Sequence, residues 1–201
     1  ATEKDITGDD MKELLCLLCG YTFGCLQTSY IIVRHCTGED IRSVGSGNAG
    51  TMNTLLSFGR TPAAVVLFGD MLKTIIPAIL CVVAFPDKRP EIIISVCSLG
   101  VFLGHCYPFW LRFRGGKGVA VAAAFALMLD IRVFFISVIV AGVFGLVCHS
   151  AAYSSYTFAI MLFVCTVSLG YDSSVILCAL SESIIIVLLH LGRKKTLQPG
   201  K

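Results

Sequence analysis

Long apolar runs dominate this chain and restrict it to a helical membrane fold. Seven of them can be read along the sequence, at residues 14–33, 63–85, 92–111, 119–129, 133–148, 152–169 and 173–191. A helix needs about 20 apolar residues to cross about 30 Å of hydrocarbon, and most of these runs approach that length. The run at 119–129 is too short to cross as a straight helix, so we expect a partial or tilted element there.

The composition excludes an ordinary soluble enzyme. Hydrophobic residues make up 56% of the chain and charged residues 14%, against about 45–50% and about 25% in soluble domains. Several membrane spans leave little chain for anything else in 201 residues. We therefore expect a polar N-terminal tail at 1–13, a single membrane-embedded domain at 14–192 and a basic tail at 193–201.

The basic residues predict an orientation, because Lys and Arg gather on the cytoplasmic side of short membrane loops. With seven spans, ten of the sixteen basic residues share one side: Arg34, Arg42, Arg60, Arg112, Arg114, Lys117, Arg193, Lys194, Lys195 and Lys201. The sequence therefore predicts an all-α polytopic membrane protein with about seven transmembrane helices, its N-terminus outside and its C-terminus cytoplasmic.

A glycine-rich segment between the first two runs, "RSVGSGNAGTMN", contains the spacing GxGxxG at Gly45, Gly47 and Gly50. A dinucleotide fingerprint needs a preceding β-strand and a following helix in a βαβ unit, and here apolar membrane runs stand on both sides. Glycines can instead turn successive N–H groups into an anion-binding concavity. We call residues 44–50 the first glycine loop and expect it to hold phosphate, with a plain interfacial turn as the alternative.

A second segment, "GHCYPFWLRFRGGKGVAV", repeats this chemistry with three glycines around Lys117 and with Arg112 and Arg114 just before them. The predicted topology places residues 112–118, the second glycine loop, on the same side as the first. We expect the two loops to converge on one phosphate-bearing substrate. The alternative is that the basic residues only anchor the chain by the positive-inside rule.

Charged residues inside membrane runs are costly and mark candidate sites. Asp70 and Lys73 are three residues apart on one helical face, where a structural ion pair and a catalytic pair both remain open. Glu182 is isolated in the last run, and we assign it no role. Cys16 and Cys19 form a CxxC without a second pair, so we expect no metal site.

Three segments together, "GEDIRSVGSGNAGTMN", "FGRTPAAVVLFGDMLK" and "LGHCYPFWLRFRGGKGVA", resemble the PlsY family of bacterial integral-membrane acyltransferases over residues 38–122. The resemblance implies seven spans in the cell membrane of a bacterium, with the active site at the cytoplasmic face. It implies transfer of a fatty acyl group from acyl phosphate to the 1-hydroxyl of glycerol 3-phosphate, which yields lysophosphatidic acid and phosphate in the first step of phospholipid synthesis. It implies no cofactor, no metal and no nucleic-acid partner.

The same resemblance assigns roles to individual residues. The catalytic candidates are Ser46, Lys117, His190 and His105; the phosphate-binding candidates are Arg42, Gly45, Gly47, Asn48, Asn53, Gly115, Gly116 and Gly118; the supporting residues are Asp40, Asp70 and Lys73. Both substrates carry phosphate, so we expect electrostatic stabilisation of the tetrahedral oxyanion and of the departing phosphate. Three groups are candidates for the general base: His190, His105 and a substrate phosphate oxygen.

The chain departs from the family pattern at several positions. Cys25 and Gln27 stand in an element that commonly contains serine, Leu56 replaces an arginine, and Arg193 replaces an asparagine. An arginine's bidentate geometry is not reproduced by another nearby cation. A second function therefore stays open, a non-catalytic paralogue that binds phosphate or anionic lipid as a membrane interaction or regulatory subunit. The intact glycine loops favour the enzyme.

Overall fold

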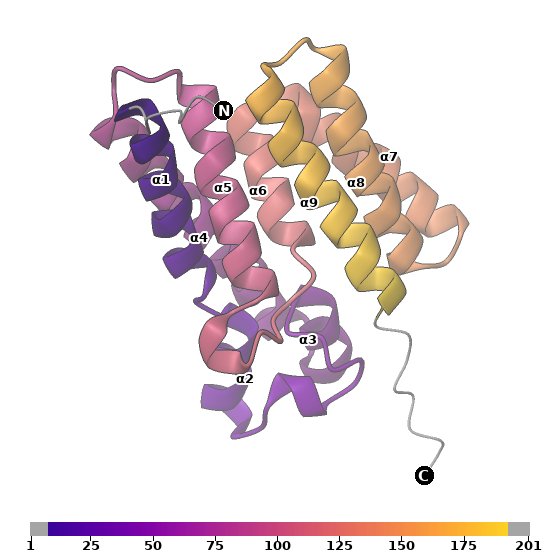
Figure 1. Ribbon diagram of the computed structural model, residues 1–201. Helices are drawn as coiled ribbons and strands as arrows, with labels where there is room; N and C mark the ends of the chain where they lie inside the picture. The colour runs from indigo at the N-terminus through magenta and orange to yellow at the C-terminus, as the bar shows by residue number, and fades with distance from the viewer. Residues whose placement is uncertain (1–7, 193–201) are drawn as a thin grey trace.

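The computed structural model describes residues 8–192, and helices account for nearly all of that part of the chain (Figure 1). The elements are α1 (Gly8–Gly24), α2 (Thr28–Thr37), the 3-10 turn η1 (Ile41–Ser43), α3 (Thr51–Phe58), α4 (Arg60–Ala84), α5 (Pro90–Cys106), the 3-10 turn η2 (Phe109–Leu111), α6 (Val119–Leu129), α7 (Ile131–Val147), α8 (Ala151–Ser168) and α9 (Ser173–Gly192). The all-helical prediction is confirmed. The tail expected at 193–201 and the first seven residues lie outside the described residues.

Five helical segments within residues 8–192 are long and apolar enough to cross a membrane: Gly8–Thr37, Arg60–Ala84, Pro90–Leu111, Ala151–Ser168 and Ser173–Gly192. The apolar helices α6 and α7 are shorter. All seven expected runs are thus helical, although the first is interrupted at residues 25–27 and its helix already begins at Gly8. The structure supports an all-helical membrane protein with five candidate spans, and the number of crossings stays a prediction.

The helices form two groups joined by α6 (Figure 1). Helices α1, α4 and α5 pack together in one group, and α7, α8 and α9 in the other. The 11-residue helix α6 contacts members of both groups. Its contacts place the short run between the two groups. Its length of about 16 Å at 1.5 Å per residue is about half of the hydrocarbon thickness.

Glycines allow α1 and α5 to approach closely. Gly20 and Gly24 of α1 face the backbone of α5, while Gly100 and Gly104 of α5 face the backbone of α1. A Cβ on any of the four would overlap a carbonyl oxygen of the other helix. Paired small residues at a spacing of four are the usual means of close helix packing in membranes, where apolar burial gives little driving force.

The largest apolar core joins α5, α6, α8 and α9, with Phe102, Phe125, Leu162 and Ile186 buried at its centre. Glu182 of α9 is fully buried as well, and its two carboxyl oxygens have no hydrogen-bond partner among residues 8–192. Below the bundle in Figure 1, α2, η1 and α3 lie beside the connection from α5 to α6. Both glycine loops are therefore at the same end of the molecule.

Candidate functional site

Asn53 organises the first glycine loop. This residue lies in the first turn of α3, and its side chain is 3% exposed. Its Oδ1 accepts a hydrogen bond from the Ser46 backbone N–H at 3.0 Å, and its Nδ2 donates to the carbonyl oxygens of Ile41 at 3.1 Å and Val44 at 2.9 Å. Both the oxygen and the nitrogen of the amide are hydrogen-bonded to backbone groups. Asn53 therefore lies behind the loop and fixes its shape.

Two glycines in left-handed conformation turn this loop. The φ angles are +57° at Gly45 and +67° at Gly47, a region that residues with a Cβ adopt rarely. A Cβ on Gly45 would also overlap Oδ1 of Asn53. Ser46 is exposed between the two glycines, and Gly50 caps the N-terminus of α3 without a side chain. The open first turn of a helix supplies N–H groups that attract anions.

The second glycine loop folds back onto the end of α5. Gly115 donates its backbone N–H to the carbonyl oxygen of Cys106 at 3.1 Å, and Gly116 donates to that of His105 at 3.0 Å. Gly118 caps the N-terminus of α6 with a φ of +81°. Lys117 is half-buried between these glycines. The loop thus carries its lysine immediately before a helix N-terminus.

The two loops meet at Gly116. A Cβ on this residue would overlap Nε2 of His105 and lie 2.7 Å from the carbonyl oxygen of Ala49 in the first loop. Only a glycine at this position leaves room for the His105 ring and the Ala49 carbonyl oxygen to lie so close to the backbone of the second loop. The structure therefore brings the two loops together, with the ring of His105 at their junction.

A buried ionic network supports His105 from behind. Lys73 Nζ lies 2.9 Å from Oδ1 of Asp70 and 2.8 Å from Nδ1 of His105, and it donates to the carbonyl oxygen of Leu26 at 2.7 Å. Asp70 also accepts a hydrogen bond from Thr28 Oγ1 at 3.0 Å. Lys73 thus joins the carboxylate of Asp70 to the imidazole ring of His105. The sequence predicts the Asp70–Lys73 pair, but not the histidine that joins it.

The interruption between α1 and α2 holds this network in place, a feature that sequence reasoning missed. Gln27 is fully buried and donates Nε2 to the carbonyl oxygens of Gly24, Gly104 and His105 at 3.3, 3.4 and 3.0 Å. Gln27 is one of the departures from the family pattern. A buried glutamine between apolar runs was the available signal, since such an amide needs hydrogen-bond partners.

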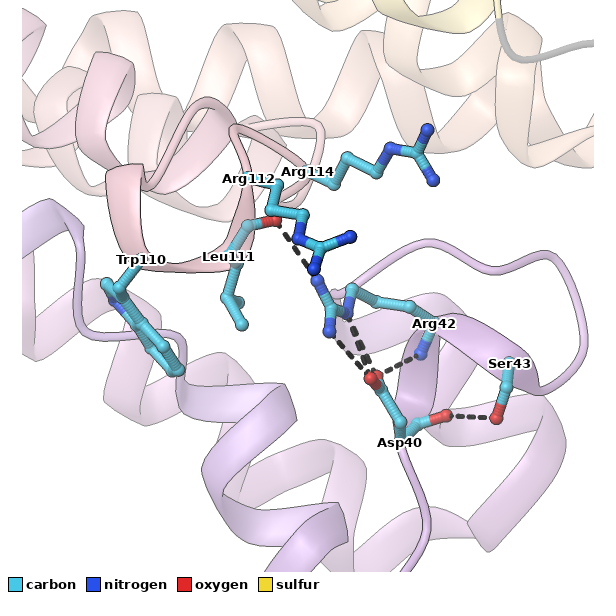
Figure 2. Close-up of a pocket in the computed structure, with 7 residues that line it drawn as sticks. All are labelled: Asp40, Arg42, Ser43, Trp110, Leu111, Arg112 and Arg114. Carbon is cyan, nitrogen blue, oxygen red and sulfur yellow. Dashed lines mark hydrogen bonds and ion pairs between the residues drawn. The ribbon is translucent and has the colours of Figure 1, made fainter.

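Arg42 lies in a separate cavity rather than in the first glycine loop (Figure 2). Its Nε and Nη2 donate to the carboxylate of Asp40 at 3.0 and 2.7 Å, and Nη1 donates to the carbonyl oxygen of Leu111 at 3.1 Å. Its guanidinium also lies over the ring of Tyr30, 5.3 Å from the centroid. The Arg42 guanidinium holds the pKa of Asp40 below its usual value. The predicted phosphate-binding arginine thus has a structural partner.

The remaining predicted residues are spread over the same end of the molecule. Nδ1 of His190 lies 2.8 Å from the carbonyl oxygen of Ile186, and its ring packs edge-on against Tyr156. The C-terminal end of α9, which carries His190, points toward the end where the glycine loops lie (Figure 1). Cys25 is buried, whereas Leu56 on α3 is 79% exposed. Arg193 lies outside the described residues.

The chemistry of this site is that of an anion receptor. The N–H groups of Ser46, Gly115 and Gly116 are already hydrogen-bonded within the protein. The N-termini of α3 and α6 and the Lys117 ammonium, which the two loops place at this end, are groups of the kind that bind phosphate in proteins. Within residues 8–192, no group of three or more His, Cys, Asp or Glu side chains is arranged to hold a metal ion. The arrangement can hold phosphate groups and stabilise negative charge that develops beside them.

Comparison with known proteins supports this description. Residues 14–198 match the family model of glycerol-3-phosphate acyltransferase. The glycerol-3-phosphate acyltransferase of Rubrobacter xylanophilus is 42% identical over 119 residues, which cover 59% of this chain and 58% of the relative. The glycerol-3-phosphate acyltransferase of Pelagibacter ubique is 31% identical over 152 residues, which cover 76% of this chain and 77% of the relative. The match to a Lactobacillus johnsonii relative covers 62% of its length, so the chain spans about three fifths of some of these relatives.

Solved structures agree with the family match. A crystal structure of PlsY, an integral membrane glycerol 3-phosphate acyltransferase, in its glycerol 3-phosphate form is similar with a TM-score of 0.80 and 29% identity. The similarity covers 91% of this chain and 94% of that one. The lysophosphatidic acid form has a TM-score of 0.74 and 27% identity. As its motifs predict, the chain belongs to the glycerol-3-phosphate acyltransferase family.

Proposed function

We propose that this protein transfers a fatty acyl group from acyl phosphate to the 1-hydroxyl of glycerol 3-phosphate. The hydroxyl oxygen forms the new ester bond, the bond between the acyl carbon and the phosphate oxygen breaks, and phosphate leaves. The hydroxyl proton passes to a base, and the products are lysophosphatidic acid and phosphate. The observation that carries the proposal is the meeting of the two glycine loops at Gly116 in a chain of this family.

Ser46 and Lys117 are the proposed contacts to the substrates. Ser46 is exposed between two left-handed glycines, and Lys117 precedes the N-terminus of α6. The lysine and the N–H groups in the first turns of α3 and α6 would stabilise the oxyanion and the leaving phosphate more strongly than the ground state, which lowers the barrier. Acyl phosphate is already activated, so the reaction requires no covalent enzyme intermediate and we propose no cofactor.

His105 is proposed as a positioning residue rather than as the general base. Its ring is 3% exposed, and Lys73 occupies Nδ1. It therefore acts through the loop junction at Gly116, where its Nε2 lies. His190, at the end of α9, and a substrate phosphate oxygen remain the candidates for the base.

We also propose seven crossings, with the N-terminus outside and the site at the cytoplasmic face. Arg42, Arg112 and Arg114 line one cavity at the end that carries the loops. At the other end, Lys88 pairs with Asp9 at 3.0 Å and Arg89 with Asp172 at 3.0 Å, so acids neutralise the basic residues there. The excess of positive charge at the loop end supports a cytoplasmic orientation.

The direct test is acyl transfer by the purified protein to labelled glycerol 3-phosphate, with palmitoyl phosphate and palmitoyl-CoA offered as donors in parallel. We expect product from palmitoyl phosphate alone. Ser46→Ala and Lys117→Ala should each lower the rate at least about 100-fold, the usual cost of losing one preorganised group that stabilises a transition state. Lys88→Ala, at the opposite end, is the control.

Two results would contradict this scheme. Unchanged rates in both Ser46→Ala and Lys117→Ala would remove the site assignment. No product from either donor, with a folded protein that still binds glycerol 3-phosphate, would favour the non-catalytic paralogue. The observation behind that second candidate is Leu56, which is 79% exposed where the family pattern has an arginine.

A further inference from the structure

A cavity of about 420 Å³ lies beside the glycine loops, and neither Ser46 nor Lys117 lines it (Figure 2). Its walls are Asp40, Arg42, Ser43, Trp110, Leu111, Arg112 and Arg114. They come from η1 on one side and from η2 with the start of the second glycine loop on the other. The volume falls within the range of about 300–1,000 Å³ that is common for small-molecule sites.

The charges of this cavity are unbalanced. Three guanidinium groups line it against the single carboxylate of Asp40, and that carboxylate already accepts hydrogen bonds from Arg42. Figure 2 shows the Arg112 side chain pointing toward that of Arg42. Neither Arg112 nor Arg114 forms a salt bridge with another described residue. Three positive charges around one cavity favour an anion bound among them.

The backbone holds Arg112 in a conformation that costs energy. Arg112 has a φ of +56° and Phe113 a φ of +58°, both in the left-handed region that residues with a Cβ rarely adopt. Two consecutive residues of this kind direct the Arg112 side chain toward Arg42 (Figure 2). Unfavourable backbone conformations persist where the surrounding structure enforces them, and they concentrate at ligand sites.

The remaining wall is rigid and suited to a membrane interface. Trp110 donates Nε1–H to the carbonyl oxygen of Cys25 at 2.8 Å and packs edge-on against Tyr30, with 5.4 Å between ring centroids. Phe109 and Phe113 are 63% and 59% exposed on the same turn. Exposed aromatic residues beside arginines are typical of the headgroup region of a bilayer. The cavity thus offers arginines that can bind a phosphate group and, beside them, exposed aromatic side chains that can contact lipid.

We propose that this cavity is a second anion site, which binds a phosphate monoester group through Arg42, Arg112 and Arg114. Arg42 uses three of its five N–H groups on Asp40 and Leu111, so two remain for a ligand. Planar guanidinium groups bind phosphate oxygens in bidentate fashion, and several of them match a dianion better than a monoanion. The ligand is the headgroup of an anionic lipid or a water-soluble phosphate, and both present the same group.

Trp110 makes the site directly observable, because it is the single tryptophan of the chain. Its fluorescence would be titrated in detergent-purified protein with inorganic phosphate, with glycerol 3-phosphate and with short-chain phosphatidic acid. Short-chain phosphatidylcholine, which is zwitterionic and has no phosphate monoester, would be the control. We expect a saturable change with the phosphate ligands and none with phosphatidylcholine. Tighter binding of phosphatidic acid identifies a lipid headgroup, and equal binding of inorganic phosphate identifies a water-soluble ligand; both support the proposal.

Arginine variants test whether the change in Trp110 fluorescence comes from binding in this cavity. Arg112→Gln should weaken binding about tenfold or more, as expected for hydrogen bonds to a charged group. Arg112→Lys should restore part of the affinity. Arg60→Gln, which removes an exposed arginine outside the cavity, should have no effect. An absent response, or equal affinities in the wild type and in Arg112→Gln, would overturn the proposal.

The second anion site and the proposed acyl transfer can be refuted independently. Ser46→Ala and Lys117→Ala should abolish acyl transfer and leave the Trp110 response intact, because neither residue lines the cavity. If the response disappears with these variants, the ligand is bound at Ser46 and Lys117, and the second site is refuted. A normal response in a protein without acyl transfer would refute the proposed function alone.

Discussion

At the scale of single residues, Asn53 shows how one amide shapes an anion-binding loop. Its oxygen accepts the Ser46 N–H, and its nitrogen donates to the carbonyl oxygens of Ile41 and Val44. The oxygen and the nitrogen of a buried amide both need hydrogen-bond partners, because leaving one of them unpaired destabilises the folded protein by about 1–3 kcal/mol. The residue that sequence comparison marks as phosphate-binding thus acts from behind the loop.

Asn53→Asp and Asn53→Ala should both reduce acyl transfer at least about tenfold, because each releases the loop that carries Ser46. Asp should destabilise the protein more than Ala, since its second oxygen would face two carbonyl oxygens where the amide nitrogen now donates. Thermal unfolding and acyl transfer measure the two effects. Met52→Ala, an exposed neighbour on the same helix, is the control. Wild-type activity in both Asn53 variants would contradict this role.

At the scale of elements, the contact between α1 and α5 depends on residues without a side chain. Gly100 and Gly104 face the backbone of α1, and Gly20 and Gly24 face that of α5. Helix propensity alone would favour alanine at these positions. The close approach also brings the interruption at residues 25–27 against the end of α5, where Gln27 bonds to the carbonyl oxygen of His105.

Gly100→Ala should destabilise the protein by about 1–3 kcal/mol, because the added methyl group forces the two helices apart. Gly142→Ala on α7 is the matched control, since a Cβ there meets nothing within 4 Å. That variant should be neutral or more stable, by up to about 1 kcal/mol from helix propensity. Thermal unfolding of both variants in the same detergent tests the contact. Equal stability of the two variants would contradict it.

At the scale of the whole molecule, the two ends of the bundle differ in charge and in chemistry. One end carries both glycine loops and the arginine cavity. At the other, ion pairs join the beginning of α1 to the turn between α4 and α5, as between Asp9 and Lys88. A bilayer between these ends would separate the anion sites from the neutralised end.

Cysteine labelling in sealed vesicles tests the proposed orientation. In right-side-out vesicles, a membrane-impermeant maleimide should not modify Cys36, which is exposed at the loop end. It should modify Pro86→Cys, placed in the exposed turn after α4, in a Cys36→Ala background. Inside-out vesicles should give the opposite pattern. Labelling of both positions from one side, or the reverse pattern, would contradict the orientation.

The amino-acid sequence by itself determined the helices and much of the local chemistry. Hydropathy is a property of neighbouring residues, so the apolar runs predicted every long helix and also the short α6. The spacing of Asp70 and Lys73 predicted their ion pair, because residues three apart share a helical face. The glycines at 45 and 47 indicated turns that require positive φ.

Only the tertiary structure decided which distant residues meet. His105 joins Lys73 across two helices, and Gln27 holds the end of α5. Arg42 lines a cavity that it shares with Arg112. None of these contacts has a local pattern, since each joins segments at least 32 residues apart. Helix packing explains them, because it determines which partners a buried polar group can reach, and Glu182 reaches none among residues 8–192.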